Sequence, residues 1–195
     1  MHLNRSQIQL VRGINASVNA AIFYQREEPG RDRWQNLTET LELCAGDCED
    51  IALAKMVLLQ TWIPADDLRL LRVKTGGGEA HMVLGVRSES ACLVLDNRSN
   101  SVVTLEESEY GVPVYSIDGR GQVYSRGGNL TAARIRKFDE AIGKDKISSK
   151  DAVRLASRAM VAPGSLTTEE IRALAGSVLT QVPDKEQGGR DVRPG

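Results

Sequence analysis

Aromatic side chains are scarce in this chain and make up only 4% of its 195 residues. A hydrophobic core built from this sequence must therefore be aliphatic, and the length predicts one domain with an appendage. An excess of charge is lacking as well, because the formal net charge is −1 and no dense basic cluster occurs. The basic surface that binds nucleic acid is thus missing, and we expect no nucleic-acid partner.

Cysteines and long apolar runs are also few. Three cysteines are an odd number, which excludes a framework in which every cysteine is paired. No stretch approaches the ~20 consecutive apolar residues that cross a membrane, so we expect no transmembrane segment. Residues 1–5 lead into an amphipathic segment and not into the apolar core of a signal peptide. The sequence therefore predicts either a cytoplasmic protein or one whose leader preceded this numbering.

The most informative stretch is residues 46–50, Gly-Asp-Cys-Glu-Asp, which leads into a long apolar segment. A turn residue followed by carboxylates and an apolar body is typical of a helix N-terminus, because the helix dipole stabilises negative charge there. The apolar body predicts a helix from Cys48 to about Trp62 that is buried on most sides. Cys48 then lies in the first turn, where unpaired backbone N–H groups stabilise a thiolate.

His81 and Asp96 lie in two apolar segments that predict a β-hairpin. The register that sets Arg87 opposite Ser90 also sets His81 opposite Asp96. We expect a loop of four residues, because Ser-Glu is poor chemistry for a two-residue turn, and this loop leaves the pairing parity unchanged. Side chains that face each other across two strands have Cβ atoms ~5 Å apart, so Asp96 would accept the imidazole N–H and fix its tautomer.

The remaining pattern predicts an α+β protein in three parts. Residues 1–128 form a first domain, 129–182 a helical extension, and 183–195 a charged, disordered tail. Thr167 and Glu170 have the spacing of a capping box at the start of the last helix. Helices are expected at 6–25, 34–46, 130–142, 149–161 and 167–182, strands at 68–73, 102–105, 112–117 and 122–124, and a turn at 100–101.

Several segments, taken in order, resemble the transglutaminase-like cysteine peptidases. They are Trp34 and Glu39, Gly-Asp-Cys-Glu-Asp (46–50), Glu-Ala-His-Met-Val-Leu (79–84), Leu-Asp-Asn (95–97) and Pro-Val-Tyr-Ser-Ile (113–117). The resemblance spans roughly residues 24–124 and is closer to the bacterial LapG-like branch, which comprises calcium-dependent periplasmic proteases that cleave adhesins. It implies a papain/transglutaminase-like core in which a buried helix carrying Cys48 packs on an antiparallel sheet.

The resemblance and the residues together predict a cysteine endopeptidase with a triad of Cys48, His81 and Asp96. Cys48 would be the nucleophile, His81 the base that takes its proton and later protonates the leaving amine, and Asp96 the group that orients His81. The alternatives are a buried packing role for Cys48 and a turn-capping role for Asp96. Cys44 and Cys92 are assigned to packing.

The expected substrate is a protein such as a surface adhesin, cut at a site rich in Ala and Gly. The resemblance also implies a periplasmic location, and a regulatory protein partner is a further expectation. Transamidation uses the same acyl-enzyme, with an amine in place of water, and stays open.

The carboxylates of Asp47, Glu49 and Asp50 oppose the ionisation of the neighbouring thiol. One interpretation is that they only stabilise the helix start. The other is that they bind Ca²⁺, which takes clustered carboxylate oxygens and would neutralise their charge. The resemblance also implies calcium at these residues.

Two further functions compete with catalysis. In the first, Cys44, Cys48, His81 and Cys92 hold zinc in a structural or binding module, although the spacing of the first two is unusual for such a site. In the second, the domain is catalytically inactive and the helices after Leu130 are its docking surface.

Overall fold

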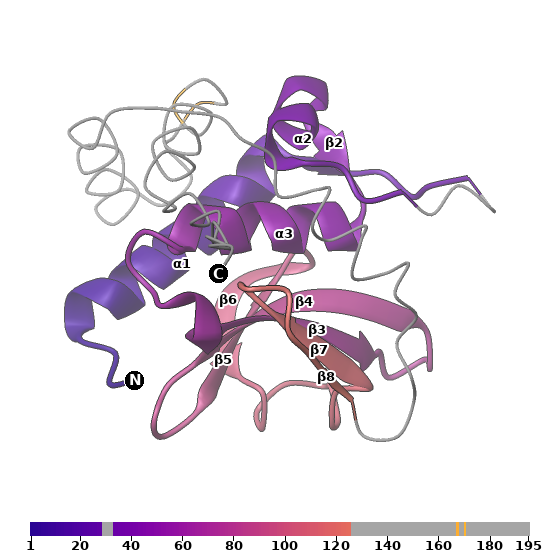
Figure 1. The fold of residues 1–195 in the computed structure, drawn as a ribbon. Coiled ribbons are helices and arrows are strands. Elements are labelled where there is room, and N and C mark those ends of the chain that lie inside the picture. Colours follow the sequence, from indigo (N-terminus) through magenta and orange to yellow (C-terminus); the bar gives the residue numbers. More distant parts are fainter. Residues whose placement is uncertain (29–32, 126–166, 168–169, 171–195) are drawn as a thin grey trace, which may run out of the picture.

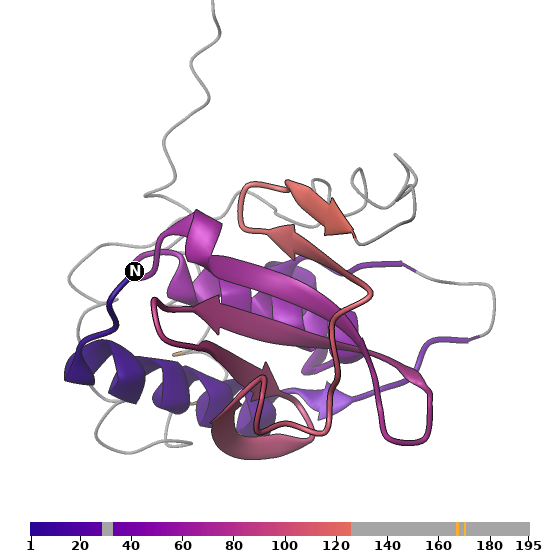
Figure 2. The ribbon, with the colours of Figure 1, turned by 90° about the horizontal axis from the view of Figure 1, so that it is seen from below.

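The computed structural model describes residues 1–28, 33–125, 167 and 170, and its helices and strands form an α+β fold. α1 (Arg5–Ala21) and α3 (Cys48–Leu59) lie on one face of a six-stranded antiparallel sheet, and α2 (Leu37–Leu43) packs against α3 (Figures 1 and 2). The sheet has the order β6-β5-β4-β3-β7-β8. Its strands are β3 (Leu68–Lys74), β4 (Ala80–Arg87), β5 (Cys92–Asp96), β6 (Ser99–Thr104), β7 (Tyr115–Asp118) and β8 (Val123–Ser125). The expected architecture of a buried helix on an antiparallel sheet is confirmed.

The start of α3 is fixed by a capping box. The Asp47 carboxylate accepts the backbone N–H groups of Glu49 and Asp50 at 2.8 and 3.2 Å, and the Asp50 carboxylate accepts the N–H of Asp47 at 3.1 Å. These bonds satisfy backbone donors that every helix start leaves unpaired. The predicted start at Cys48 is confirmed, whereas the helix ends at Leu59, before the predicted Trp62.

The first helix ends four residues before the predicted Gln25, because its last predicted turn is extended backbone. There β1 (Phe23–Tyr24) pairs in parallel with β2 (Ala45–Gly46), the segment that directly precedes Asp47. The N–H of Phe23 donates to the Cys44 carbonyl at 2.8 Å. This short pair brings Tyr24 next to the start of α3.

The central strands bury side chains on both faces of the sheet. On the helix side, Leu70, Met82, Leu84 and Leu95 belong to the main core with α1 and α3. On the opposite side, alternate residues form a smaller cluster of Leu71, Val73, Val83, Val94 and Tyr110. Successive side chains of a strand point to opposite faces of the sheet. A strand that is covered on both faces therefore has a continuous run of apolar residues in its sequence. The second cluster matters for function because Tyr110 comes from the loop that covers it.

The β4–β5 hairpin has the predicted parity but not the predicted register. Arg87 lies opposite Cys92 and not Ser90, so His81 and Asp96 are offset by two residues and not directly opposite. The predicted loop length of four residues is confirmed, but the loop lies at 88–91, where a hydrogen bond of 2.8 Å from the Ser88 N–H to the Ala91 carbonyl closes it. An offset of two keeps both side chains on the same face of the sheet.

The next turn lies at residues 97–98, and the predicted turn at 100–101 is wrong because those residues belong to β6. Asp96 Oδ1 accepts the Arg98 N–H at 3.0 Å, the local bond by which Asp residues stabilise tight turns. The turn-capping role weighed for Asp96 is therefore real.

The predicted helices at 130–142 and 149–161 and the tail at 183–195 lie outside the described residues. Thr167 and Glu170 are described, and their reciprocal bonds of 2.9 and 3.2 Å confirm the predicted capping box. In the described part of the chain, no helix combines the length and apolar character needed to cross a membrane.

Candidate active site

Cys48 is the first residue of α3, and its half-buried side chain lies against β4. The Met82 backbone N–H donates to the Cys48 sulfur, which favours the thiolate. This amide is available because β5 pairs with β4 only from Leu84 to Arg87, so the first half of β4 has no β5 partner. The nucleophile candidate is thus held at the point where the central hairpin opens.

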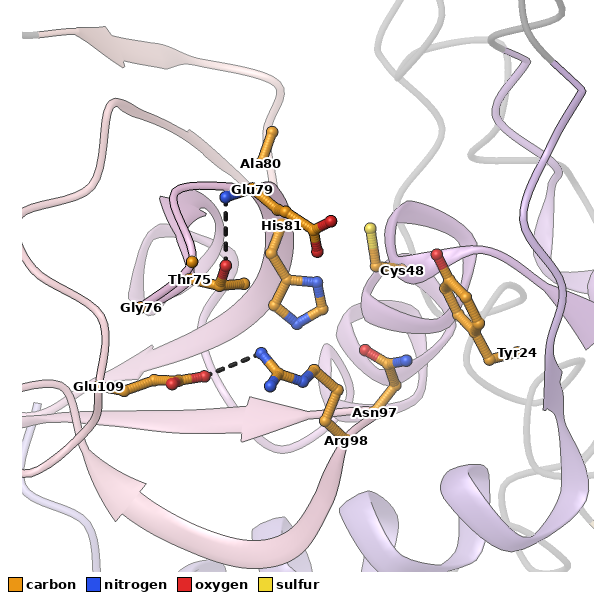
Figure 3. A pocket seen from close by; sticks show the side chains of 11 residues that line it. Tyr24, Cys48, Thr75, Gly76, Glu79, Ala80, His81, Asn97, Arg98 and Glu109 are labelled. Atoms are coloured by element: carbon orange, nitrogen blue, oxygen red, sulfur yellow. Dashed lines mark hydrogen bonds and ion pairs between the residues drawn. The ribbon is translucent and has the colours of Figure 1, made fainter.

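His81 and Asp96 form a buried pair beside Cys48. His81 Nε2 lies 2.9 Å from Asp96 Oδ1, and both residues are less than a tenth exposed. The other ring nitrogen, Nδ1, is left on the side of Cys48 (Figure 3). When Nε2 carries the proton and donates it to the carboxylate, Nδ1 is the unprotonated nitrogen that can accept the thiol proton. The predicted contact between His81 and Asp96 is confirmed.

Tyr110 completes the surroundings of Asp96 and was missed from the sequence. Its hydroxyl donates to Asp96 Oδ2, and its ring lies 5.8 Å from the His81 ring between centroids. Burial alone would raise the pKa of Asp96, but the bonds from His81, Tyr110 and the Arg98 N–H outweigh it and hold the pKa at about 2. The carboxylate is therefore ionised at any pH at which the protein would work.

The Cys48 thiol has a raised pKa of about 11, caused first by burial and then by the charge of Asp47. The Glu49 carboxylate adds to this rise, while the Met82 N–H and the Arg72 guanidinium oppose it. The predicted conflict between the helix start and its acidic neighbours is present in the structure. With this pKa the resting thiol is protonated at neutral pH, so its activation needs a base.

The three carboxylates predicted to hold calcium point in different directions. Glu49 Oε1 forms an ion pair of 3.0 Å with Arg72 on β3. Asp50 Oδ1 accepts the Gln35 backbone N–H at 2.7 Å, and the pKa of Asp50 is raised to about 7 by burial first and by the Asp47 charge second. Within the ranges that the structure describes, no group of three or more acidic, histidine or cysteine side chains is arranged to hold a metal.

Cys48 and His81 open into one cleft of about 630 Å³ (Figure 3). Its walls come from the 75–80 loop, from Tyr24 and from the 97–98 turn, and the ion pair between Arg98 and Glu109, 2.8 Å long, closes one side. Thr75, Gly76 and Gly77 of the 75–80 loop line the cleft. Tyr24, Arg98 and Glu109 were missed, because they reach the cleft from segments far apart in the sequence.

The zinc alternative does not fit this geometry. Cys92 packs with the second cluster, on the face of the sheet away from the helices, whereas Cys48 packs against the main core. Cys44 donates to the Leu41 carbonyl at 3.4 Å. Cys44, Cys48, His81 and Cys92 therefore form no common metal site. Trp34, one of the residues that carry the family resemblance, is buried in the main core.

Comparison with known proteins agrees with the geometry. The family model of the bacterial transglutaminase-like cysteine proteinases matches residues 1–114. The EGTA-treated LapG of Legionella pneumophila is similar in fold at 24% identity and a TM-score of 0.59, over 72% of this chain and 79% of that one. A second LapG structure from that organism has 26% identity and a TM-score of 0.58, over 72% and 78% of the two chains. The calcium-bound LapG has 25% identity and a TM-score of 0.58, over 72% and 80%.

No curated protein matches the chain. The matched residues 1–114 make up more than half of the 195 residues and contain Cys48, His81, Asp96 and Tyr110. They also contain the helix and the hairpin on which this cluster is built. The chain therefore belongs to the bacterial transglutaminase-like cysteine proteinases and is a cysteine peptidase.

Proposed function

We propose that this peptidase is an endopeptidase that cleaves a protein through a Cys48–His81–Asp96 triad. The observation that carries the proposal is the bond of 2.9 Å between His81 Nε2 and Asp96 Oδ1, with the imidazole facing the cleft that Cys48 also lines. A nucleophile, a base within its reach and a third group that orients the base are the signature of an activated thiol.

The acylation step follows from these positions. His81 Nδ1 accepts the thiol proton as the Cys48 sulfur attacks the scissile carbonyl, and Asp96 stabilises the imidazolium that forms. The Asp47 carboxylate accepts the backbone N–H groups of Glu49 and Asp50. The Cys48 N–H can then donate to the substrate carbonyl oxygen, which becomes negatively charged during the attack. The imidazolium then protonates the amine as the C–N bond breaks, which leaves a thioester on Cys48.

Deacylation uses the same residues in reverse roles. The neutral imidazole removes a proton from water, the resulting hydroxide attacks the thioester, and the thiolate leaves and is reprotonated. An amine in place of water would give transamidation. Hydrolysis is the proposed outcome because the family is a proteinase family.

Calcium dependence is the second part of the proposal. Calcium-bound and EGTA-treated forms occur among the similar LapG structures, and the acidic residues Asp47, Glu49 and Asp50 surround Cys48 here. In chemistry the donors fit a hard cation, which prefers carboxylate oxygens. Their arrangement does not yet form a calcium site, because the Glu49 carboxylate is paired with Arg72. Bound calcium would supply positive charge at the start of α3, and Asp47, Glu49 and Asp50 are the residues that would hold it.

The proposed substrate is a protein such as a surface adhesin, and a regulatory protein partner remains a prediction. The triad is tested by iodoacetamide labelling with peptide mapping, together with cleavage of a proteome-derived peptide library. We expect Cys48 to be the cysteine that is labelled and all cleavage to be lost in Cys48→Ala. Cys44→Ala and Cys92→Ala are the matched controls and should cleave normally. Cleavage at the wild-type rate by Cys48→Ala would refute the proposed function.

A further inference from the structure

A fully buried lysine lies on the helix that carries the nucleophile. Lys55 is 0% exposed, although lysine is almost never buried in this way without a partner. It follows Cys48 by seven residues, close to two helical turns, so the two side chains project from the same side of α3. None of the steps proposed above uses this side chain.

In the described part of the chain, the Lys55 ammonium has no hydrogen-bond partner. Burial lowers the pKa of Lys55 to about 7, and the Asp96 carboxylate is the charged group that opposes this change. An uncompensated buried charge costs several kcal/mol, so a residue of this kind tends to persist where it serves a function. The position of Lys55 therefore calls for a role that involves Asp96.

Two asparagines of α1 hold the same turn that Asp96 begins. The side-chain amide of Asn19 donates to the Asp96 carbonyl at 2.9 Å, and that of Asn15 donates to the Ser99 carbonyl at 2.9 Å. Both asparagine side chains keep a buried carbonyl oxygen for which the described residues offer no donor. α1 packs against α3, β5 and β6, so these two acceptors and the Lys55 donor belong to one packed region.

Little positive charge contacts the buried Asp96 carboxylate. Its oxygens accept bonds from His81, Tyr110 and the Arg98 backbone, while the Arg98 guanidinium pairs with Glu109. In the proposed mechanism His81 must be neutral when it accepts the thiol proton, so at that point it brings no positive charge to Asp96. A nearby cation stabilises a buried carboxylate such as that of Asp96, whose hydrogen-bond donors are neutral. In return, the carboxylate stabilises a buried ammonium such as that of Lys55, which has few acceptors.

We propose that Lys55 is a positioning residue of the triad, which holds the 96–99 turn so that the Asp96 carboxylate stays aligned with His81. Because Lys55 Nζ has no direct hydrogen-bond partner among the described residues, its acceptors are the 96–99 turn and the carbonyl oxygens of Asn15 and Asn19, reached through an internal water molecule. This inference rests on the proposed triad and adds a residue that touches neither the thiol nor the substrate.

The test is Lys55→Met, which removes the charge and keeps an unbranched side chain of similar length. We expect kcat to fall about tenfold or more with KM unchanged, because substrate contacts remain while the orientation of the base is lost. The free energy of unfolding should stay the same or rise, since a buried charge with weak pairing is removed. Leu58→Met, an equally buried change on α3, is the matched control and should keep the wild-type kcat.

Coupling to Asp96 separates positioning from general packing. If Lys55 acts through Asp96, Lys55→Met has no further effect on kcat/KM once Asp96→Asn is present. Effects that multiply in the double variant, or a wild-type kcat in Lys55→Met, would overturn the inference. If Asp96→Asn and Cys48→Ala are impaired while Lys55→Met is normal, only this inference fails. If Asp96→Asn is fully active, the proposed triad fails instead.

A structural measurement covers the case in which Lys55→Met and the milder Lys55→Gln do not fold. In a crystal structure of the wild-type protein, Lys55 Nζ should lie within ~3.2 Å of an acceptor in the 96–99 turn, Asn15 or Asn19, or of a water bound to one of them. Acceptors that all belong to other segments would refute the positioning role.

Discussion

His81 and Tyr110 hold the Asp96 carboxylate from two sides, one oxygen each, with their rings 5.8 Å apart. Both residues donate a hydrogen bond to the ionised carboxylate of Asp96. Tyr110 therefore prevents the carboxylate from rotating away from the His81 imidazole. The second core cluster supports this arrangement, since Tyr110 is buried within it.

Tyr110→Phe should therefore impair catalysis without removing any member of the triad. A hydrogen bond to a charged group contributes about 1.5–3 kcal/mol, so we expect kcat to fall by roughly 10- to 100-fold. Steady-state kinetics on a peptide substrate would measure this. Tyr124→Phe, which removes the hydroxyl that donates to Asp118 at 3.2 Å far from the cleft, is the control. Equal kinetics for the two variants would contradict the role of Tyr110.

The lowered pKa of Asp96 makes part of the folding free energy depend on pH. The pKa is about 2 in the folded protein against an ordinary value of 3.8, so the carboxylate stabilises the fold above pH 3.8. This contribution, about 2 kcal/mol, is lost as the pH falls toward 2. Urea unfolding of the wild type and Asp96→Asn from about pH 5 to about pH 2 should show stabilities that converge with falling pH. A pH-independent difference would show that the pKa of Asp96 is not lowered.

Calcium dependence predicts that EGTA lowers the cleavage rate and that Ca²⁺ restores it much more readily than Mg²⁺, which demands stricter geometry. Asp47→Asn should weaken calcium binding in calorimetry, yet it keeps an oxygen that caps α3 nearly as well as Asp does. The fold, followed by circular dichroism, should thus be unchanged. If calorimetry detects no binding to the wild-type protein, the acidic residues serve only the helix start.

Arg72 competes with calcium for Glu49 if Glu49 is a ligand. Replacing Arg72 by Met removes the ion pair of 3.0 Å, and calcium should then bind more tightly. Calorimetry on the inactive Cys48→Ala background isolates binding from catalysis. Arg69→Met is the control, because Arg69 stacks on Tyr124 at 4.0 Å and does not pair with Glu49. Weaker binding in Arg72→Met would exclude Glu49 as a ligand.

Gly46 leaves no room for a side chain. A Cβ atom on Gly46 would lie 2.7 Å from the Cβ of Asp50, so Gly46→Ala must displace the capping box that positions Cys48. We expect activity to fall more than the free energy of unfolding, because a small misplacement of a nucleophile is costly to the rate. Gly76→Ala in the cleft loop, where the nearest atom is 3.6 Å away, is the matched control. Normal kinetics in Gly46→Ala would contradict this account.

Features of the site that depend on local hydrogen bonds could be predicted from the sequence. The start of α3 follows from Asp47 and Asp50, three residues apart, and the shared face of His81 and Asp96 follows from the parity of the hairpin loop. The register was wrong by two residues, because the bond between Ser88 and Ala91 sets which strand residues first pair. The sequence does not encode that choice in any short pattern.

Contacts between distant segments could not be predicted in the same way. Tyr110 reaches Asp96 from a loop after β6, and Tyr24 reaches the cleft through a parallel pair of two residues with β2. Neither contact has a periodic signal, since each depends on how the layers pack. Lys55 was read as part of an apolar helix, and its complete burial appears only once α1 and α3 are placed on the sheet.

The capped helix supplies the thiol, whereas the hairpin supplies the imidazole and its carboxylate. These two units are separate in the sequence and meet only where α3 lies on β4. A chain in which these two units are apart has no thiol beside the imidazole. Peptidase activity therefore requires that α3 is packed on the hairpin, and formation of either unit alone does not create the catalytic set.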